Sequence, residues 1–173
     1  AGISMMSGLP SGPALVEDAL KNLLKGDYIS GTNIKKISRS LPLEVFFQIV
    51  ADHTSQDIAT KVTTALDAEN PSAVHNWLSR KVQEGLIKQI YTFNFDTLQE
   101  QSLGSILKRS TSGRSVVLTS EDLDFRLIKF HGSADSQGVI SIGEYVQGFS
   151  EPVRKQFLDD WNGKSILVLG YGG

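Results

Sequence analysis

The sequence contains no cysteine in its 173 residues. This absence excludes disulfides, a thiol nucleophile and any zinc site built on thiolate ligands. No apolar run approaches the roughly 20 residues that cross a bilayer. The first residues also lack the basic segment and the long apolar stretch of a signal peptide. We therefore expect a cytoplasmic location and no membrane partner.

The chain also has no large excess of positive or negative charge. Lys and Arg together number 17, Asp and Glu number 19, and the net charge is -2. Because binding to nucleic acid or anionic lipid draws on net positive charge, the overall balance favours neither partner. The 40% of hydrophobic and 21% of charged residues are typical of one folded domain.

Apolar residues recur at helical spacing in several segments, and shorter runs rich in branched and aromatic residues lie between them. Helices are expected over 13–26, 41–50, 58–66, 70–85, 97–108 and 144–161, and strands over 86–93, 116–118, 126–130 and 165–169. The opening segment 1–13 is predicted to be a loop because it is rich in Gly, Ser and Pro, and 108–115 is predicted to be a polar loop.

Strands that alternate with longer helical stretches indicate an α/β fold, with a parallel sheet covered by helices on both faces. In such sheets, ligands bind beyond the carboxyl ends of the strands. Four unusual loops are expected at that edge: 1–13, 94–96, 131–133 and 170–173. Their convergence predicts a binding site there.

The glycines of the opening loop allow two interpretations. Gly2 and Gly8 would let backbone N–H groups approach phosphate oxygens at a helix amino terminus. Many such turns only connect elements, and neither a Rossmann fingerprint nor a P-loop spacing is present. The glycines alone do not decide between phosphate binding and a simple connection.

Three polar side chains at strand ends are candidate catalytic or binding groups. His131 follows an apolar strand, and its ordinary pKa of about 6.5 suits proton transfer, although a structural hydrogen bond is the commoner role of a lone histidine. Asn94 and Asp96 flank Phe95, so an extended backbone points both side chains to one side. They could position a water and a carboxamide or ribose hydroxyl. Asx residues at strand ends are also turn formers and helix caps, and Asp96 could cap a helix from Thr97.

Other polar residues carry weaker signals. His53 and His75 lie in helical stretches without a second ligand at metal spacing, which favours surface or packing roles. The basic stretch 108–114 is most simply a solvated loop.

Four loops, taken in order, resemble motifs of the sirtuin (silent-information-regulator) superfamily. The opening AGIS and SGLP resemble that family's G-A-G-I-S-x-x-S-G-I-P loop without its first glycine, and TFNFD at 92–96 is similar to T-x-N-x-D. KFHGS at 129–133 is similar to the K-x-H-G box, and LGY at 169–171 to a later G-T-S or G-Y-S motif. The resemblance covers nearly the whole chain and implies a Rossmann-like domain that cleaves the bond between nicotinamide and ribose in NAD+.

The resemblance implies a role for each matching residue. Three residues of the opening loop would contact the phosphates and ribose of NAD+: Ala1, Gly2 and Ser4. Asn94 would hold the reactive ribose and a water, and Asp96 would engage the nicotinamide carboxamide. His131 would act on the ribose hydroxyls as a base or orienter, and Gly170 would face the adenosine half.

Protein-deacylating sirtuins carry Phe-Arg after the S-G-I-P loop, Gln at the position of Phe93, and a four-cysteine zinc module, and this chain departs from all three. The TFNFDTL stretch, the helix-rich segment 35–83 and the GEY box at 143–145 are instead similar to a zinc-free branch of bacterial NAD hydrolases in antiphage defence. This similarity implies an inserted helical segment at about 35–83, no zinc, and a homo-oligomer with additional domains or a partner effector protein. It also implies that a first strand and a C-terminal part lie outside residues 1–173.

We therefore expect an NAD+ glycohydrolase, with NAD+ as substrate, water as acceptor and no direct binding of nucleic acid. The enzymatic alternative is an NAD-dependent protein deacylase or ADP-ribosyltransferase, which needs an acyl-lysine tunnel and usually the zinc module. The non-enzymatic alternative is a sensor that binds NAD or ADP-ribose without turnover. A sensor needs no general base, so the presence of both Asn94 and His131 favours an enzyme.

Overall fold

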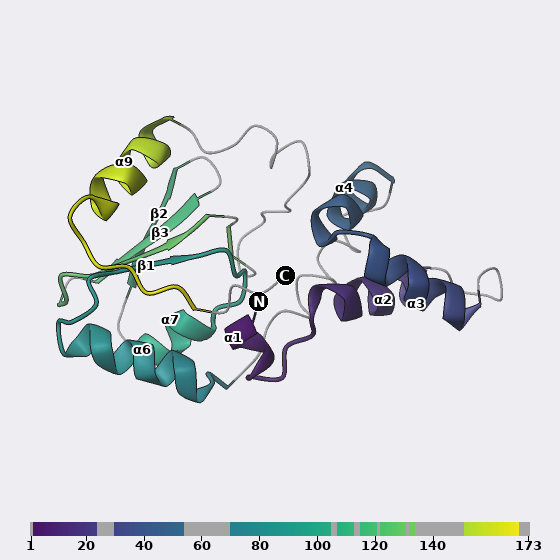
Figure 1. Cartoon of the computed structure of the whole chain (residues 1–173), viewed down its shortest axis with the longest axis horizontal. Coiled ribbons are helices and arrows are strands. Elements are labelled where there is room, and N and C mark those ends of the chain that lie inside the picture. Colours follow the sequence, from purple (N-terminus) through teal and green to yellow (C-terminus); the bar gives the residue numbers. More distant parts are fainter. Residues whose placement is uncertain are drawn as a thin grey trace.

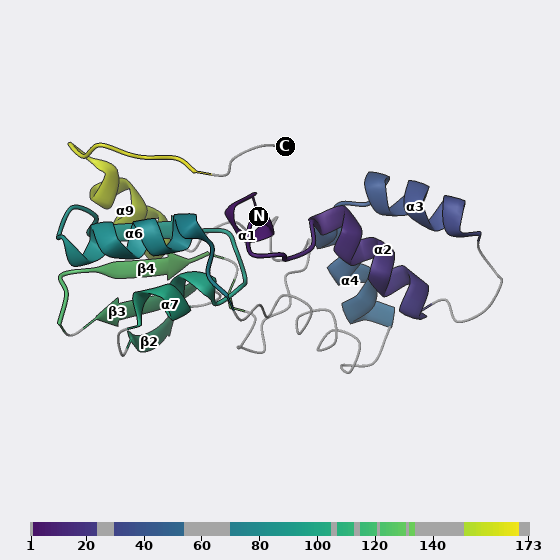
Figure 2. The ribbon, with the colours of Figure 1, turned by 90° about the horizontal axis from the view of Figure 1, so that it is seen from below.

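The computed structural model describes residues 2–23, 30–53, 70–104, 107–112, 115–120, 122–130, 132–133 and 151–169. These residues form two lobes (Figure 1). One is a helical lobe of α2 (Gly12–Leu23), α3 (Gly31–Ser40) and α4 (Leu43–His53). The other is a sheet lobe, in which α6 (Ala73–Gln83), α7 (Leu98–Leu103) and α9 (Glu151–Trp161) accompany the strands. The short helix α1 (Gly2–Met5) lies between the lobes (Figure 2).

The sheet is mixed, and this corrects the expectation of a parallel sheet. Its order is β1-β4-β3-β2, with β1 at Gln89–Thr92, β2 at Leu107–Ser112, β3 at Ser115–Ser120 and β4 at Arg126–Lys129. β1 and β4 are parallel, whereas β3 is antiparallel to both β2 and β4. Only two residues separate β2 from β3, and a connection that short permits only antiparallel pairing. The fold class is therefore α/β with one parallel pair.

Several expectations differ from the structure. The helix expected over 97–108 ends at Leu103, followed by Gly104 with a φ of 61°, and the unexpected helix α3 spans Gly31–Ser40. The predicted polar loop 108–115 contains β2, which lies at a sheet edge, where exposed polar side chains are compatible with a strand. The predicted buried strand 165–169 is irregular, and Val168 is 67% exposed, because an apolar run becomes a strand only where a neighbour pairs with its backbone. The predicted opening loop contains the helical turn α1.

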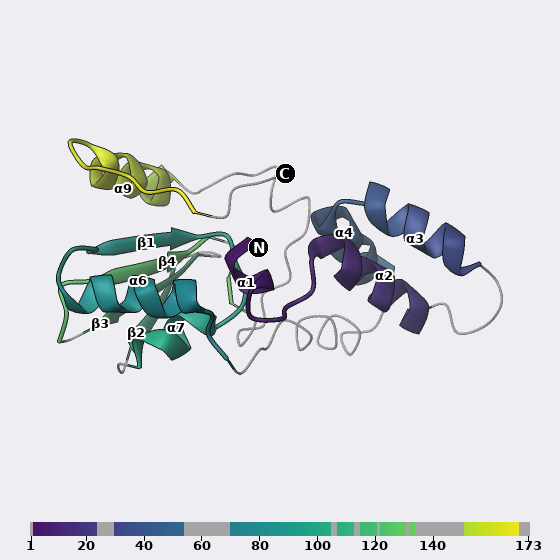
Figure 3. The same ribbon diagram turned by 60° about the horizontal axis from the view of Figure 1, so that its bottom comes forward.

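Helices cover both faces of the sheet, as expected. On one face, Ile90 of β1 packs with Val82 of α6 and Leu103 of α7 in a buried apolar cluster. Successive strand residues point to opposite faces, and the next residue, Tyr91, makes an edge contact with Phe157 of α9 at 4.9 Å between ring centroids. Helix α9 therefore lies on the side opposite α6 and α7 (Figure 3).

The helical lobe has its own apolar core. Its buried members come from α2 and α4: Leu15, Val16, Ala19, Phe46 and Val50. Helices α3 and α4 of the predicted insertion 35–83 lie in this lobe, whereas α6 from the same segment packs in the sheet lobe (Figure 1). Among the described residues, no helix is both long and apolar enough to cross a membrane.

Asp160 anchors α9 to the sheet. It is 7% exposed and accepts hydrogen bonds from the Tyr91 hydroxyl, from Arg126 Nη2 at 3.0 Å and from Gln156 Nε2 at 3.0 Å. Burial alone would raise the pKa of Asp160, but these hydrogen bonds and the charge of Arg126 outweigh it and lower that pKa. Burial, followed by the bond to Asp160, raises the pKa of the Tyr91 hydroxyl. The anchor is therefore stable with an ionised Asp160 and a neutral tyrosine.

Asp160→Asn is expected to lower the free energy of unfolding at pH 7 by about 1–3 kcal/mol, because charge-assisted hydrogen bonds are lost. The folded state lowers the pKa of Asp160 below its ordinary value of 3.8. The stability that the ionised carboxylate contributes is therefore complete above pH 3.8, and it is lost as the pH falls through the pKa of the folded state. Urea unfolding of the wild type and the variant, at pH 7 and below pH 3.8, measures the loss of stability and its dependence on pH. The matched control is Asp159→Asn, at the exposed neighbour. A stability difference that is constant with pH would contradict this role.

Candidate functional site

The candidate site lies at the carboxyl ends of the parallel pair β1 and β4. Parallel strands end at the same edge of a sheet, and the segments that follow are 93–97 after β1 and 130–133 after β4. Helix α1 lies beyond this edge (Figure 3). Three distant parts of the sequence therefore meet where ligands bind in α/β folds.

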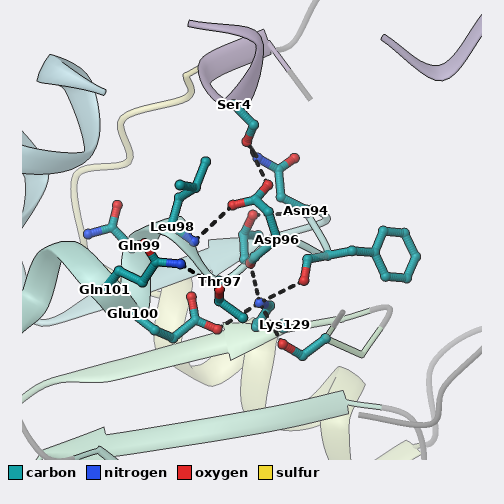
Figure 4. A network of polar contacts seen from close by, with 12 residues as sticks. Ser4, Asn94, Asp96, Thr97, Leu98, Gln99, Glu100, Gln101 and Lys129 are labelled. Atoms are coloured by element: carbon teal, nitrogen blue, oxygen red, sulfur yellow. Dashed lines mark hydrogen bonds and ion pairs between the residues drawn. The ribbon is translucent and has the colours of Figure 1, made fainter. Parts of the chain in front are cut away.

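Three of the predicted residues are in direct contact there (Figure 4). Asn94 Nδ2 donates to Ser4 Oγ at 2.7 Å, and Ser4 Oγ donates to Asp96 Oδ2 at 2.7 Å. Ser4 is 4% exposed and Asp96 is 7% exposed, whereas Asn94 is half-buried. The amide, hydroxyl and carboxylate thus form one connected group, with the amide at its more accessible end.

Asp96 bonds to the start of α7, which is the structural role that the sequence left open for it, while Thr97 is the N-cap residue. Its Oδ1 accepts from the backbone N–H of Leu98 at 3.2 Å, in the first turn of α7, while Oδ2 accepts from Ser4. A carboxylate offers about four lone-pair positions, so these two bonds leave capacity for a ligand donor. The bond to Leu98 fixes the carboxylate relative to α7, and the serine fixes it relative to α1.

Lys129, to which the sequence analysis gives no role, is the central buried charge of the site. Its side chain is 0% exposed. Its Nζ donates to the backbone oxygens of Phe95 at 3.1 Å and of Asp96, to Glu100 Oε1 at 2.7 Å and to Ser133 Oγ at 2.9 Å. The signal in the sequence was Lys129 between the apolar residues Ile128 and Phe130, because a charged residue on a buried strand needs specific partners.

Gly132 gives the second loop its turn. Its φ is 85°, in the left-handed region that side chains other than glycine disfavour. The next residue, Ser133, is 0% exposed and contacts Lys129 from this turn. Replacement of Gly132 would strain the segment that brings Ser133 back to the strand end.

His75 has a structural role near the site. It is 1% exposed, and its Nδ1 accepts from the backbone N–H of Ser72 at 3.1 Å, at the start of α6. Burial lowers the pKa of His75, while the charge of Asp96 partly opposes the shift. His75 is buried and caps α6, so its replacement would disturb the fold, and it cannot serve as a neutral control for catalysis. His53, at the end of α4, is exposed and can serve as that control.

Of the remaining predicted site residues, the structure describes only Gly2. Gly2 begins α1 and is exposed. Ala1, His131 and Gly170 lie outside the described residues, as does the box at 143–145. Within the described ranges, no group of three or more His, Asp or Glu side chains is placed to hold a metal ion.

Ser4→Ala is expected to lower the free energy of unfolding by about 1–3 kcal/mol, because it removes a buried partner from both Asn94 and Asp96. Ser7→Ala is the matched control in the same segment. The Ser7 hydroxyl is buried and has no hydrogen-bond partner among the described residues, so its removal breaks no hydrogen bond there and is not expected to lower the free energy of unfolding. Urea unfolding compares the two, and equal effects would contradict the bridging role of Ser4.

The site brings together an amide, a carboxylate and a hydroxyl at one sheet edge. Such groups donate to and accept from ribose hydroxyls and carboxamides. Comparison with protein-family models, with curated proteins and with solved structures found no match to this chain.

Proposed function

We propose that this protein is a sirtuin-like NAD+ glycohydrolase that cleaves the bond between nicotinamide and ribose, with water as the acceptor. The observation that carries this proposal is the connected group of Ser4, Asn94 and Asp96 beyond the carboxyl ends of two parallel strands. The resemblance assigns these residue types, in this order, to the ribose and nicotinamide of NAD+. It also leads us to expect them at this edge of the sheet.

The proposed reaction breaks the C1′–N bond, and its electron pair leaves with nicotinamide. Positive charge develops on the ribose, and preorganised polar groups stabilise such charge most effectively. Asp96 supplies a nearly buried carboxylate, held by Ser4 and by the amino end of α7. It engages the nicotinamide carboxamide and its negative charge favours the ribosyl cation.

Water then forms the new bond to C1′ and loses a proton. Asn94, which is half-buried at the accessible end of the group, holds the ribose and orients this water with its amide. His131 is assigned the role of base or ribose orienter because it follows β4, which ends at the same edge as β1. General-base assistance of this kind contributes roughly 10²- to 10⁴-fold.

The wider setting belongs to the same proposal. Parallel β1 and β4 with helices on both faces support a Rossmann-like sheet. The similarity to the zinc-free branch supports a role in bacterial antiphage defence, in which the domain acts within a homo-oligomer or with a partner effector protein. A cytoplasmic location belongs to the same proposal and rests on the lack of a signal peptide and of a long apolar run.

The test is release of nicotinamide from NAD+ by the triggered, assembled protein, measured by chromatography with and without an acetyl-lysine peptide. The proposal expects release that does not depend on the peptide. Release that requires the peptide would support a deacylase instead. Tight binding of NAD+ without release would support the sensor.

A further inference from the structure

We propose that Lys129 is a positioning residue that holds Asn94 and Asp96 in their reactive arrangement, an inference that rests on the proposed NAD+ hydrolysis. Lys129 Nζ lies behind the site and bonds to the backbone rather than to the side chains of the connected group (Figure 4). It belongs to β4, whereas the residues that it holds follow β1.

The contacts of Lys129 fix the loop that carries the site. The backbone oxygens of Phe95 and Asp96 both accept from Nζ. These two carbonyls belong to the peptide units on either side of Asp96, so one ammonium restricts rotation there and sets the direction of the Asp96 side chain. Asn94 is held through Ser4, which bonds to both side chains. The third tie, to Ser133 Oγ at 2.9 Å, joins the loop after β4 to the same nitrogen. One buried charge thereby links both strand-end loops.

Glu100 makes this arrangement electrically neutral. Its Oε1 lies 2.7 Å from Lys129 Nζ, and the side chain of Glu100 is 15% exposed. A buried ammonium without a counter-charge would oppose the positive charge that develops on the ribose. The carboxylate of Glu100 compensates the ammonium, so that Lys129 orients the loop without opposing the reaction.

Lys129→Met retains the length of the side chain and removes the ammonium. Because a displacement of about 1 Å can cost roughly 100-fold in rate, we expect kcat for nicotinamide release to fall roughly 100-fold. The affinity for ADP-ribose, which lacks the nicotinamide that Asp96 engages, should change far less than kcat in titration calorimetry. The matched control is Lys88→Met, since Lys88 precedes β1 at the opposite end and pairs with Asp124 on the surface. It should turn over at the wild-type rate.

Chemical rescue separates positioning from a general loss of structure. The chain has no cysteine, so Lys129→Cys introduces a single thiol that can be aminoethylated in denaturant before refolding. This treatment restores an ammonium at nearly the length of lysine, and we expect it to restore most of kcat. Wild-type protein taken through the same steps controls for refolding. Failure of a folded, aminoethylated protein to recover kcat would overturn the inference.

Glu100→Gln is a second variant with nearly the same shape, for use if Lys129→Met does not fold. It leaves the charge of Lys129 uncompensated, and we expect kcat to fall much more than the affinity for ADP-ribose. Its control is Glu84→Gln, at a more exposed partner of Lys81. Wild-type rates in both Lys129→Met and Glu100→Gln would overturn this inference alone. A wild-type protein that releases no nicotinamide would overturn the proposed function as well.

Discussion

Asn94→Ala is expected to slow release of nicotinamide from NAD+ by roughly 10²- to 10³-fold, equivalent to about 2.7–4 kcal/mol of activation free energy, the range seen when one preorganised donor is removed. The amide of Asn94 is fixed by its bond to Ser4, and alanine can neither hold the ribose nor orient a water. Asn76→Ala is the matched control, because Asn76 is exposed on α6. Initial rates at saturating NAD+ provide the comparison, and a wild-type rate in Asn94→Ala would contradict the proposed mechanism.

His131→Ala tests the other half of the same mechanism. Loss of a general base or ribose orienter is expected to lower the rate by roughly 10²- to 10⁴-fold. The control is His53→Ala, since His53 is exposed at the end of α4 and is expected to leave the rate unchanged. An equal loss in both variants would indicate a general effect on the fold rather than a role in the reaction.

Leu127→Ala is expected to lower the free energy of unfolding by about 2–5 kcal/mol, because it leaves a cavity in a close-packed core. Leu127 is 0% exposed in β4 and packs in the apolar cluster with Val82 and Leu103. This cluster supports the strand that carries Lys129, so the change also weakens the base of the candidate site.

Leu86→Ala is the matched control for this core substitution. Leu86 is 70% exposed just before β1, and its truncation is expected to change stability by less than about 0.5 kcal/mol. Urea unfolding measures both variants. A small effect of Leu127→Ala would mean that this cluster contributes little to the stability of the sheet lobe.

Part of the secondary structure was predictable because its signals are local, although helix α3 (Gly31–Ser40) was not expected from them. Spacing of apolar residues predicted α2, α4 and α6, and runs of branched residues predicted β1 and β4. The edge strand β2 was missed because a strand exposed to solvent needs no apolar pattern. The run 165–169 has such a pattern, yet it is irregular and exposed in the structure. Strand pairing depends on distant partners, which a local pattern does not specify.

The polar residues that follow the strands can be read from the sequence alone, and alternation correctly placed the Asn94 and Asp96 side chains on one side, where both contact Ser4. How these groups are held depends on contacts between distant parts of the chain. Lys129 is 33 residues away from Asp96 along the chain, and no local spacing connects them. The parallel pairing of β1 with β4 brings them together, because strand pairing converts a large sequence separation into a hydrogen-bond distance.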